Sequence, residues 1–451
     1  MANFTVSPGV SLNEIDQTFL TAEPIQAGAA IIGPTVKGPI ETPIKVTSYT
    51  EYTTMFGGVI ESGSQNYSYL TSISAYNYFN HGGESLLVTR VASGSFTSAT
   101  SSTFTNLAST DSFTLETISE GTIMNTGASG TGGALATGTK DNVRWEITTA
   151  NTSSGTFSLS IRQGNDITNK KNVLESFNNL SLDPNSPRYI SQVIGDQKLA
   201  YDSVNNQIST TGEYLNNSRF VRVKSVNTPT PNYLDPNGTP ASAGFKNSIP
   251  VVGNGTFGGA TGTPFTSTQA KFYQNISATD SQGLTGTDYT NAIALLSNTD
   301  DYMFNVLFTP GLTDESHAAQ ITSIITNTQN RGDNLFVYDT VNYGSTVTQA
   351  ISKASTRDSS YAATYWPWVR ISDPATGKLV FVPASTVIPG VYAFNDRIAA
   401  PWFAPAGINR GGLNSVLSAE YKLTATNKDN LYEANVNPIA TLPREGVVVF
   451  G

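Results

Sequence analysis

The chain has 451 residues, of which only 13% are charged, and a formal net charge of −9 from 25 basic and 34 acidic residues. Because no basic run occurs, nucleic acid is excluded as a partner; because cysteine is absent, disulfides, thiol nucleophiles and thiolate metal sites are excluded. The length indicates about three domains, and the abundance of Gly, Ser, Thr and Asn favours a folded, β-rich chain.

Residues 1–23 have the pattern of an extended arm. Apolar residues alternate with polar ones on both sides of a break at Ser7-Pro8-Gly9, namely Phe4, Val6, Val10 and Leu12. Such a short strand cannot bury an apolar face alone, so we expect the arm to pair with a sheet edge of its own subunit or of a neighbour. The N-terminus has no signal-peptide pattern and no stretch is long enough to span a bilayer, which indicates synthesis in the cytoplasm without membrane insertion.

Residues 24–92 are expected to form a small β-rich domain. Buried strands are predicted at 29–33, 44–46 and 85–91. Two helices lie between them: one is capped by Ser48 and ends near Phe56-Gly57, and the other spans 67–79 and ends at His81.

Residues 93–285 are expected to form one or two inserted, β-rich surface domains, in which Gly-rich stretches separate short alternating strands. Gly253-x-Gly255-x-x-Gly258 matches a dinucleotide-binding pattern. The Gly- and Thr-rich residues 259–268 cannot open the helix that would receive a pyrophosphate, so a flexible loop is the better interpretation. No cofactor site is predicted.

Residues 286–451 are expected to form an α/β domain. An apolar strand at 302–308 is followed by a loop at 309–311, a helix capped by Thr313 and ended by Gly332, and a second strand at 335–338. Asp314 and Glu315 would lie in the first turn of that helix, where negative charge suits the helix dipole. Strand, helix and strand at this spacing predict a parallel pair with a right-handed crossover, in a sheet covered on both faces.

The stretch 361–413 is the expected centre of that domain. It contains predicted strands at 361–371 and 379–382, a helix from about residue 385, and a loop at 401–412. Its aromatic cluster, Tyr365, Trp366 and Trp368, could stack on a sugar or base, but such clusters more often form part of a core. Residues 446–451 are predicted to form a buried strand at the end of the sequence.

Catalytic and metal-binding chemistry is not predicted. The chain has two histidines, His81 at a helix end and His317 near a helix start, and both positions favour structural roles. No Gly-x-Ser-x-Gly nucleophile elbow occurs. We therefore expect a protein that is not an enzyme and that holds neither metal nor cofactor.

Several motifs resemble those of the contractile phage tail sheath family. They are the arm motif Ser7-Pro8-Gly9-Val10, the strand motif Leu-x-Val-x-Arg-Val at 86–91, and a C-terminal series of Tyr-Ala-Ala with Tyr-x-Pro-Trp at 361–368, Asp-Pro at 373–374, Val-Pro-x-Ser at 382–385, Pro-Gly-Val-Tyr-Ala at 389–393 and Ala-Pro-Ala-Gly at 404–407. The matches lie in both halves of the chain, and residues 93–285 correspond to the part that varies in this family.

The resemblance implies a fold and a function. The fold is a subtilisin-like, doubly wound α/β core with a small β-rich N-terminal domain and surface inserts. The function is that of a structural virion protein that forms helically stacked hexameric rings around the tail tube and contracts to drive the tube through the host envelope. The implied partners are other copies of the chain, the tail tube protein, and baseplate and tail terminator proteins, and the implied location is the virion tail.

The resemblance also implies how subunits are joined. The arm would exchange strands with an adjacent subunit through Ser7, Pro8, Gly9, Val10, Ser11 and Leu12. Family members continue beyond the motif that ends at Gly451 into a further domain and a second arm, so linkage through a C-terminal arm is in doubt for this sequence. Two other classes stay open: a β-rich carbohydrate-binding or adhesive tail surface protein, suggested by the Ser-, Thr- and Gly-rich middle, and a hydrolase built on the α/β domain.

Overall fold

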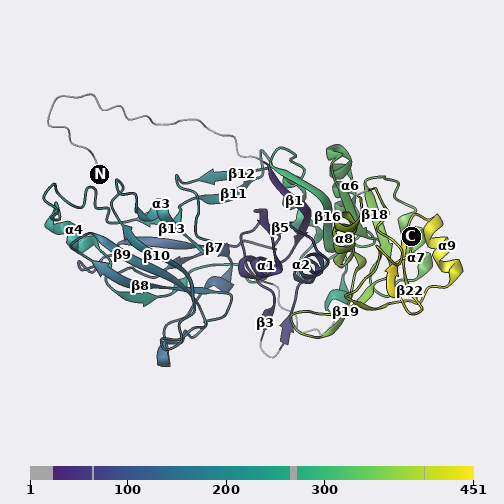
Figure 1. Cartoon of the computed structure of the whole chain (residues 1–451), viewed down its shortest axis with the longest axis horizontal. Coiled ribbons are helices and arrows are strands. Elements are labelled where there is room, and N and C mark those ends of the chain that lie inside the picture. The colour runs from purple at the N-terminus through teal and green to yellow at the C-terminus, as the bar shows by residue number, and fades with distance from the viewer. Residues whose placement is uncertain (1–23, 63–64, 265–271, 401) are drawn as a thin grey trace.

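The computed structural model describes residues 24–62, 65–264, 272–400 and 402–451, which form an elongated molecule of two parts (Figure 1). One part, the core, contains an eight-stranded sheet built from both ends of the described chain. The other part, the insert, is formed by residues 93–264 and lies at the opposite end of the molecule from the C-terminal strands. The predicted strand-exchange residues, Ser7 to Leu12, lie outside the described residues.

The core sheet has the strand order β2-β5-β1-β16-β17-β18-β22-β23. The strands from β5 to β22 run parallel, whereas the edge strands β2 and β23 are antiparallel to their neighbours. β5 is buried along its whole length, as expected for a parallel strand covered on both faces. The strands are β1 (Ile25–Gly33), β2 (Ile44–Val46), β5 (Leu86–Arg90), β16 (Tyr302–Thr313), β17 (Leu335–Asp339), β18 (Ala362–Trp366), β22 (Asn437–Leu442) and β23 (Gly446–Val449).

Helices cover both faces of this sheet, which confirms the expectation from the strand and helix spacing. α1 (Tyr49–Phe56), α2 (Leu70–Asn80) and α8 (Ile388–Ile398) pack on one face. α5 (Thr290–Leu295) and α6 (Ala318–Arg331) pack on the other. α7 (Val347–Ala354) and α9 (Ala425–Glu433) enclose Trp366 in a smaller cluster beside the C-terminal strands.

Residues 24–92 do not form a sheet of their own. They supply β1, β2 and β5, and β1 pairs directly with β16. The sequence-based division at residue 92 therefore does not separate two sheets, because the partner strands of β1 lie far away in the sequence and local patterns cannot reveal them. A small hairpin, β3 (Ile60–Ser62) and β4 (Gln65–Tyr67), extends from this region.

The predicted limits of α1 are confirmed. The Ser48 side chain accepts a hydrogen bond from the Glu51 backbone N–H, and Gly57 ends the helix with a φ of 73°. Such positive φ angles favour glycine because it has no Cβ. Gly332 ends α6 in the same way, with a φ of 70°.

The predicted start of α6 is wrong. Thr313 is the last residue of β16, which also includes the expected loop at 309–311, and the helix begins only at Ala318. Asp314 lies before the helix, is fully buried, and forms ion pairs with Arg357 and Lys353. Sequence reasoning missed this because Arg357 lies 43 residues farther along the chain.

The predicted strand at 361–371 is split. After β18 the chain enters β19 (Val369–Ser372), which belongs to a separate three-stranded sheet with β20 (Leu379–Val382) and β21 (Val416–Ala419). The predicted helix from about residue 385 is a short 3-10 turn, η5 (Ala384–Thr386), followed by α8. Two further turns lie before β16: η3 (Phe272–Asn275) and η4 (Gly286–Tyr289).

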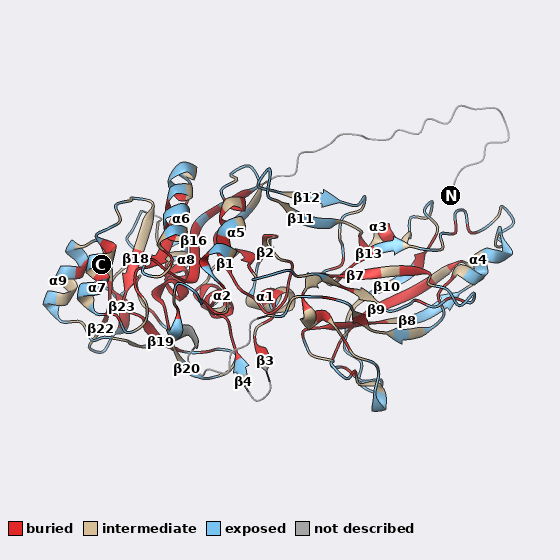
Figure 2. Ribbon diagram, turned by 180° about the vertical axis from the view of Figure 1, so that it is seen from behind, coloured by how far each residue is buried: buried red, intermediate tan, exposed pale blue. Residues whose placement is uncertain are grey.

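The insert is a β-sandwich with one apolar cluster. Its two four-stranded sheets have the orders β10-β9-β8-β14 and β13-β7-β6-β15, and their inward side chains are buried together (Figure 2). The strands are β6 (Ser98–Ser101), β7 (Phe113–Glu120), β8 (Val143–Asn151), β9 (Thr156–Gln163), β10 (Val173–Ser181), β13 (Val221–Val226), β14 (Gly253–Gly255) and β15 (Phe257–Gly258). A separate hairpin and short helices complete it: β11 (Lys198–Asp202), β12 (Gln207–Thr211), α3 (Ile190–Ile194), α4 (Ala243–Ser248), η1 (Thr122–Met124) and η2 (Thr131–Gly133).

The flexible loop predicted around Gly253, Gly255 and Gly258 is wrong, because these residues form β14 and β15. A Cβ on Gly255 would lie 2.3 Å from a ring carbon of Trp145. Glycine is therefore required at this position for backbone to approach the indole. The described residues that follow, 259–264, do not form a helix that could bind a nucleotide.

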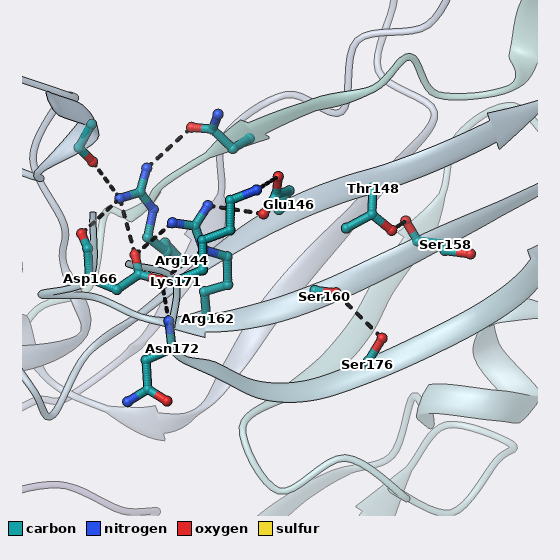
Figure 3. Close-up of polar contacts among 12 residues, drawn as sticks. Arg144, Glu146, Thr148, Ser158, Ser160, Arg162, Asp166, Lys171, Asn172 and Ser176 are labelled. Carbon is teal, nitrogen blue, oxygen red and sulfur yellow. Dashed lines mark hydrogen bonds and ion pairs between the residues drawn. The ribbon is translucent and has the colours of Figure 1, made fainter. Parts of the chain in front are cut away.

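A buried ionic network holds one end of the insert together (Figure 3). Asp166 pairs with Arg162 at 2.8 Å and with Arg144 at 3.4 Å, and all three side chains are almost completely buried. Arg162 also pairs with Glu146 at 3.0 Å, and Glu146 pairs with Lys171 at 2.6 Å. Two arginines on adjacent strands thus share one carboxylate from the loop after β9.

The chain enters and leaves the insert at adjacent points. The Thr97 backbone N–H donates to the Thr261 carbonyl at 3.2 Å, and the Thr261 N–H donates to the Thr97 hydroxyl at 2.9 Å. A loop of the core contacts the insert beside this point: Arg90 donates to the Glu120 carbonyl at 2.9 Å, and the Glu120 carboxylate accepts from the Ile40 N–H at 3.2 Å. The insert is therefore joined to the core by more than its two connecting chains.

Candidate assembly surface

The described residues contain no group of three or more His, Asp or Glu side chains placed to hold a metal ion. Among them, no helix combines the length and apolar composition needed to cross a membrane.

Both histidines have structural surroundings, as their positions in the sequence predict. His81 Nδ1 lies 2.8 Å from the Asn77 carbonyl at the end of α2, where a Cβ on Gly390 of α8 would come within 3.1 Å of the His81 side chain. His317 Nδ1 accepts a hydrogen bond from the Thr313 N–H at 3.3 Å, and burial lowers the pKa of its imidazole. His81 thus belongs to the packing of α2 on α8, and His317 to the turn that precedes α6.

Asp339 and Ser385 form a buried pair at the carboxyl end of β17. Asp339 accepts hydrogen bonds from the Ser385 hydroxyl and, at 3.0 Å, from its backbone N–H. Burial raises the pKa of Asp339 to about 7, although both hydrogen bonds act in the opposite direction. Among the described residues, no histidine hydrogen-bonds to Ser385, so this pair lacks the base of a serine hydrolase. It joins β17 to η5.

The aromatic cluster of the C-terminal region is core, as its composition favours. Tyr365, Trp366 and Trp368 are all less than 7% exposed. Trp368 Nε1 donates to the Val341 carbonyl at 3.1 Å, and the Tyr365 and Tyr392 hydroxyls are 2.7 Å apart. No face of these rings is available to a sugar or a base.

Exposed apolar side chains occur at the end of α8 and in the loop that follows it. We call these residues the aromatic patch; they are Ile398, Trp402, Phe403 and Ile408. Trp402 is 83% exposed and Phe403 is 45% exposed. Their rings lie 6.5 Å apart. Exposed large apolar side chains that lie next to each other, as Trp402 and Phe403 do, often mark an interaction site.

A buried side chain of α8 holds the loop that carries Trp402 and Phe403. Asn395 of α8 is buried and donates its side-chain amide to the Phe403 carbonyl at 3.0 Å. The Phe403 N–H donates to the Ala400 carbonyl at 3.0 Å. The chain thus turns back over the end of α8 and presents Trp402 outward.

One arginine, Arg410, contacts the aromatic patch, whereas Arg397 is directed toward a cavity beside Gly82. Arg410 lies over the ring of Phe403, 4.6 Å from its centroid, and Arg397 lies over the ring of Phe394 at 5.7 Å. Neither guanidinium forms an ion pair within the described part of the chain. Arg397 also lines a cavity of about 560 Å³ that opens between α2, α8 and the first residues of β1 and β16.

The described chain begins next to this cavity. β1 starts at Ile25 in the interior of the sheet, where Ile25 pairs with Tyr302, and Gln26 lines the cavity. The arm therefore joins the core at a central strand and not at an edge. The sequence-predicted arm residues themselves are outside the described ranges, so their contacts stay a prediction.

Residues 282–451 match the family model of the phage tail sheath protein central domain. Over these residues the chain is similar to phage tail sheath proteins. The matched residues contain most of the core sheet, from β16 to β23, together with the aromatic patch.

Curated tail sheath proteins match shorter segments. The tail sheath protein of Vibrio phage KVP40 is 34% identical over 71 residues, which are 16% of this chain and 11% of that protein. The tail sheath protein of Salmonella phage ViI is 32% identical over 95 residues, 21% of this chain and 15% of that protein. The matches thus cover well under a fifth of the length of these relatives.

Solved sheath structures also resemble the chain. A sheath tail protein from Listeria innocua is 12% identical with a TM-score of 0.49, over 94% of this chain and 68% of that one. The helical sheath of the anti-feeding prophage in its contracted state is 13% identical with a TM-score of 0.38, over 99% of this chain and 68% of that one.

The aromatic patch is the surface feature that sequence reasoning missed. Residues 401–412 were expected to form a loop of the core region, without a surface role. A signal was present, since Trp402 and Phe403 are adjacent in a segment rich in proline and glycine, where neither a helix nor a strand could bury both rings.

Proposed function

We propose that the chain is a subunit of a contractile tail sheath, which polymerises as helically stacked hexameric rings around a tail tube and drives the tube through the host envelope on contraction. The match of residues 282–451 to the sheath central domain carries this proposal. The subtilisin-like topology of the core, suggested by the resemblance, is part of the same proposal.

The core suits a subunit that moves as a rigid body. Its sheet combines strands from both ends of the described chain and is covered by helices on both faces, so the arm and the aromatic patch are attached to one packed unit. Strands exchanged between subunits would keep their main-chain hydrogen bonds while the subunits rotate. Rings could then change their spacing without dissociation.

The proposal includes partners and a location. The partners are other copies of the chain, the tail tube, the baseplate and the tail terminator, and the site of action is the virion tail after synthesis in the host cytoplasm. Residues Ser7 to Leu12 are the proposed strand-exchange segment.

Electron microscopy of the purified chain, together with its sedimentation profile, tests the proposal. We expect hollow tubes or stacked rings from the full chain. A variant lacking residues 1–20 should fold, with an unchanged circular dichroism spectrum, but sediment as a monomer. Normal tubes from this variant would refute linkage through the arm, and a full chain that stays monomeric at all concentrations would refute self-assembly of these 451 residues.

The alternative of a carbohydrate-binding surface protein gains no support from the insert. Sugar rings bind against exposed aromatic faces. Among the described residues of the insert, the exposed large apolar side chains are aliphatic: Leu107, Ile167, Val173, Leu199, Val204, Leu215, Leu234, Val251 and Val252. Saturable binding of the full chain to a glycan array would restore this alternative, and labelling by a serine-directed probe would restore the hydrolase.

A further inference from the structure

We propose that Arg90 binds a small oxyanion, with phosphate as its probe, in a cavity where the insert meets the core. The site goes beyond sheath assembly, because it gives a role to the arginine of the strand motif Leu-x-Val-x-Arg-Val at 86–91, which assembly does not use. The site lies within one chain, so it exists whether or not the chain polymerises.

The cavity lies at the carboxyl ends of two neighbouring parallel strands, β1 and β5. Its volume is about 220 Å³. Pro34 and Thr35, which follow β1, line it together with Arg90, the last residue of β5, and with Val91 and Ala92, which follow β5. Typical ligand pockets have volumes of about 300–1,000 Å³. This cavity therefore suits a small ion better than a nucleotide or a sugar chain.

The cavity also lies where the order of the core strands reverses. From β1 the chain reaches β5 on one side, by way of α1 and α2 on one face of the sheet; from β16 it reaches β17 on the other side, by way of α6 on the opposite face. Gln282 lines the cavity and donates from Nε2 to the Pro310 carbonyl of β16 at 3.3 Å. In open α/β sheets, ligands bind outside the carboxyl ends of the strands at such a reversal.

The guanidinium of Arg90 has one edge without hydrogen-bond partners. Its Nη1 donates to the Gly38 carbonyl and, at 2.9 Å, to the Glu120 carbonyl. Among the described residues, Nε and Nη2 have no partner and Arg90 forms no ion pair. The Glu120 carboxylate accepts instead from the Ile40 N–H at 3.2 Å. Because Arg90 is only 1% exposed, bulk solvent does not replace the missing partners.

Other arginines of the chain show what this edge binds. Nε and Nη2 of Arg162 donate to the two carboxylate oxygens of Asp166, both at 2.8 Å. Arg331 binds Asp333 through the same two atoms, at 3.0 and 2.8 Å. In both cases, two parallel N–H groups meet two oxygens of one anion. The equivalent edge of Arg90 has no carboxylate from the described chain, so an external oxyanion would complete it.

The surroundings of Arg90 favour binding of an anion. Burial lowers the pKa of Arg90 to about 10, so the guanidinium is still charged at neutral pH although it is poorly solvated. The ring of Phe96 covers one face of the guanidinium, with Cζ 5.2 Å from the ring centroid, which leaves the donors in the guanidinium plane available. A buried charge without a partner is costly. An oxyanion would supply both the opposite charge and two acceptors.

A bound anion would strengthen the junction between the two parts of the molecule. β5 lies on the side of the core that faces the insert (Figure 1). Phe96 and Thr263 of the insert line the same cavity as the strand ends of the core. Arg90 already joins the carbonyls of Gly38, in the core, and Glu120, in the insert. We therefore expect the anion to stabilise the insert on the core.

Titration of the full chain with inorganic phosphate, followed by isothermal titration calorimetry in Tris chloride, tests the site. One phosphate should bind per chain, and sulfate should compete with it. Arg90→Lys should weaken binding at least tenfold, because lysine keeps the charge but lacks the two parallel donors. Absence of saturable binding, or equal binding by Arg90→Lys, would overturn the proposal.

A second variant leaves Arg90 and its carbonyl contacts intact. Ser93 is exposed and lines the cavity, so Ser93→Glu would place a carboxylate at the opening and should weaken phosphate binding at least tenfold. The matched control is Ser95→Glu, which adds the same charge at an exposed position that does not line the cavity. It should change the affinity less than threefold. Equal affinities in the two variants would overturn the proposed location.

Thermal denaturation tests the effect on the junction. Phosphate should raise the unfolding midpoint of the parent chain more than that of Arg90→Lys, because a ligand that binds only the folded chain stabilises it. General exclusion of phosphate from protein surfaces would raise both midpoints equally, and that result would overturn specific binding.

Failure of this site can be separated from failure of the proposed function. A chain that binds phosphate through Arg90 but forms no tubes would support the site and refute self-assembly. A chain that forms normal tubes but binds no phosphate would overturn the site and leave the proposed function intact.

Discussion

Lys37 of the core and Asp141 of the insert form a buried ion pair, with Nζ 3.5 Å from Oδ1. The two side chains are only 8% and 10% exposed. Burial lowers the pKa of Lys37 and raises the pKa of Asp141, while the attraction between the two charges acts in the opposite direction on each. Desolvation is thus the larger effect at both groups, and the pair is tolerated because each charge has its partner.

Removal of one member of this pair should lower the free energy of unfolding more than removal of both members. We expect Asp141→Leu to lower the free energy of unfolding by about 3 kcal/mol, because Lys37 is then buried without a partner. K37M/D141L should recover most of this loss. Urea denaturation followed by circular dichroism measures the free energy of unfolding of both variants. Lys140→Ala, which breaks the exposed pair with Glu61, should cost less than about 1 kcal/mol. Equal losses in the single and double variants would contradict this account.

Asp339 should make the core less stable as the pH rises. Its folded-state pKa is about 7, whereas an unfolded aspartate has a pKa of about 3.9, so the folded state holds its proton more tightly. The stabilisation is complete below about pH 4 and is lost as the pH rises through about 7, at about 1.4 kcal/mol per pH unit between the two values. Asp339→Asn should remove this slope and raise stability at pH 8.

Unfolding of both proteins by urea at pH values from 4 to 8 measures the Asp339 effect. The pKa of Glu420 is also raised to about 7 by burial, but this group is present in both proteins, so the difference between the curves reports Asp339. Parallel curves for the parent chain and the variant would show that Asp339 ionises normally in the fold.

Gly255 should be intolerant of a side chain. Gly255→Ala would place a methyl group 2.3 Å from Trp145 and 2.4 Å from the Ser102 hydroxyl, which requires a displacement costing about 1–3 kcal/mol. Trp145 is the single tryptophan of residues 93–285, so a change in fluorescence relative to the parent chain, in which Trp366, Trp368 and Trp402 are also present, reports the insert. The matched control is Gly258→Ala, since a Cβ there would meet nothing within 4 Å. A destabilisation as large in the control as in Gly255→Ala would mean that chain flexibility, and not the Trp145 contact, sets the effect.

Asp166 should be the most sensitive member of the ionic network in the insert. Asp166→Ala would leave Arg144 and Arg162 buried without their shared carboxylate, with an expected loss of about 3–5 kcal/mol in the free energy of unfolding. Lys171→Ala removes a partly exposed member of the same network and should cost less than about 1 kcal/mol. Thermal denaturation followed by near-UV circular dichroism compares the unfolding midpoints of the Asp166→Ala and Lys171→Ala variants. Similar midpoints for the two variants would show that the network contributes little.

Local features of the fold could be predicted from the sequence because their causes are local. Ser48 and Gly57 limit α1 through bonds and angles within a few residues, and Gly332 ends α6 in the same way. The burial of Trp366 and Trp368 could be predicted because an aromatic cluster within a predicted strand more often forms part of a core than a binding surface. The resemblance in the C-terminal half was confirmed by the family match, which covers the same residues.

Features that depend on distant partners could not be predicted. Asp314 was expected at a helix start, but its contact with Arg357 arises only after the chain has passed through α6 and α7. Gly255 resembled part of a loop because Trp145, which requires the glycine, lies 110 residues earlier. The aromatic patch was missed for a related reason: an apolar residue in a sequence is normally assigned to the core, and only the folded chain shows Trp402 on the surface.

The hydrogen bonds between Thr97 and Thr261 have a consequence for variation among relatives. They close the insert at its base, so the two ends that enter the core stay at one spacing whatever lies between them. A longer, shorter or unrelated module could occupy this position while the core kept its register. A foreign domain fused between these two threonines should therefore leave the core sheet folded.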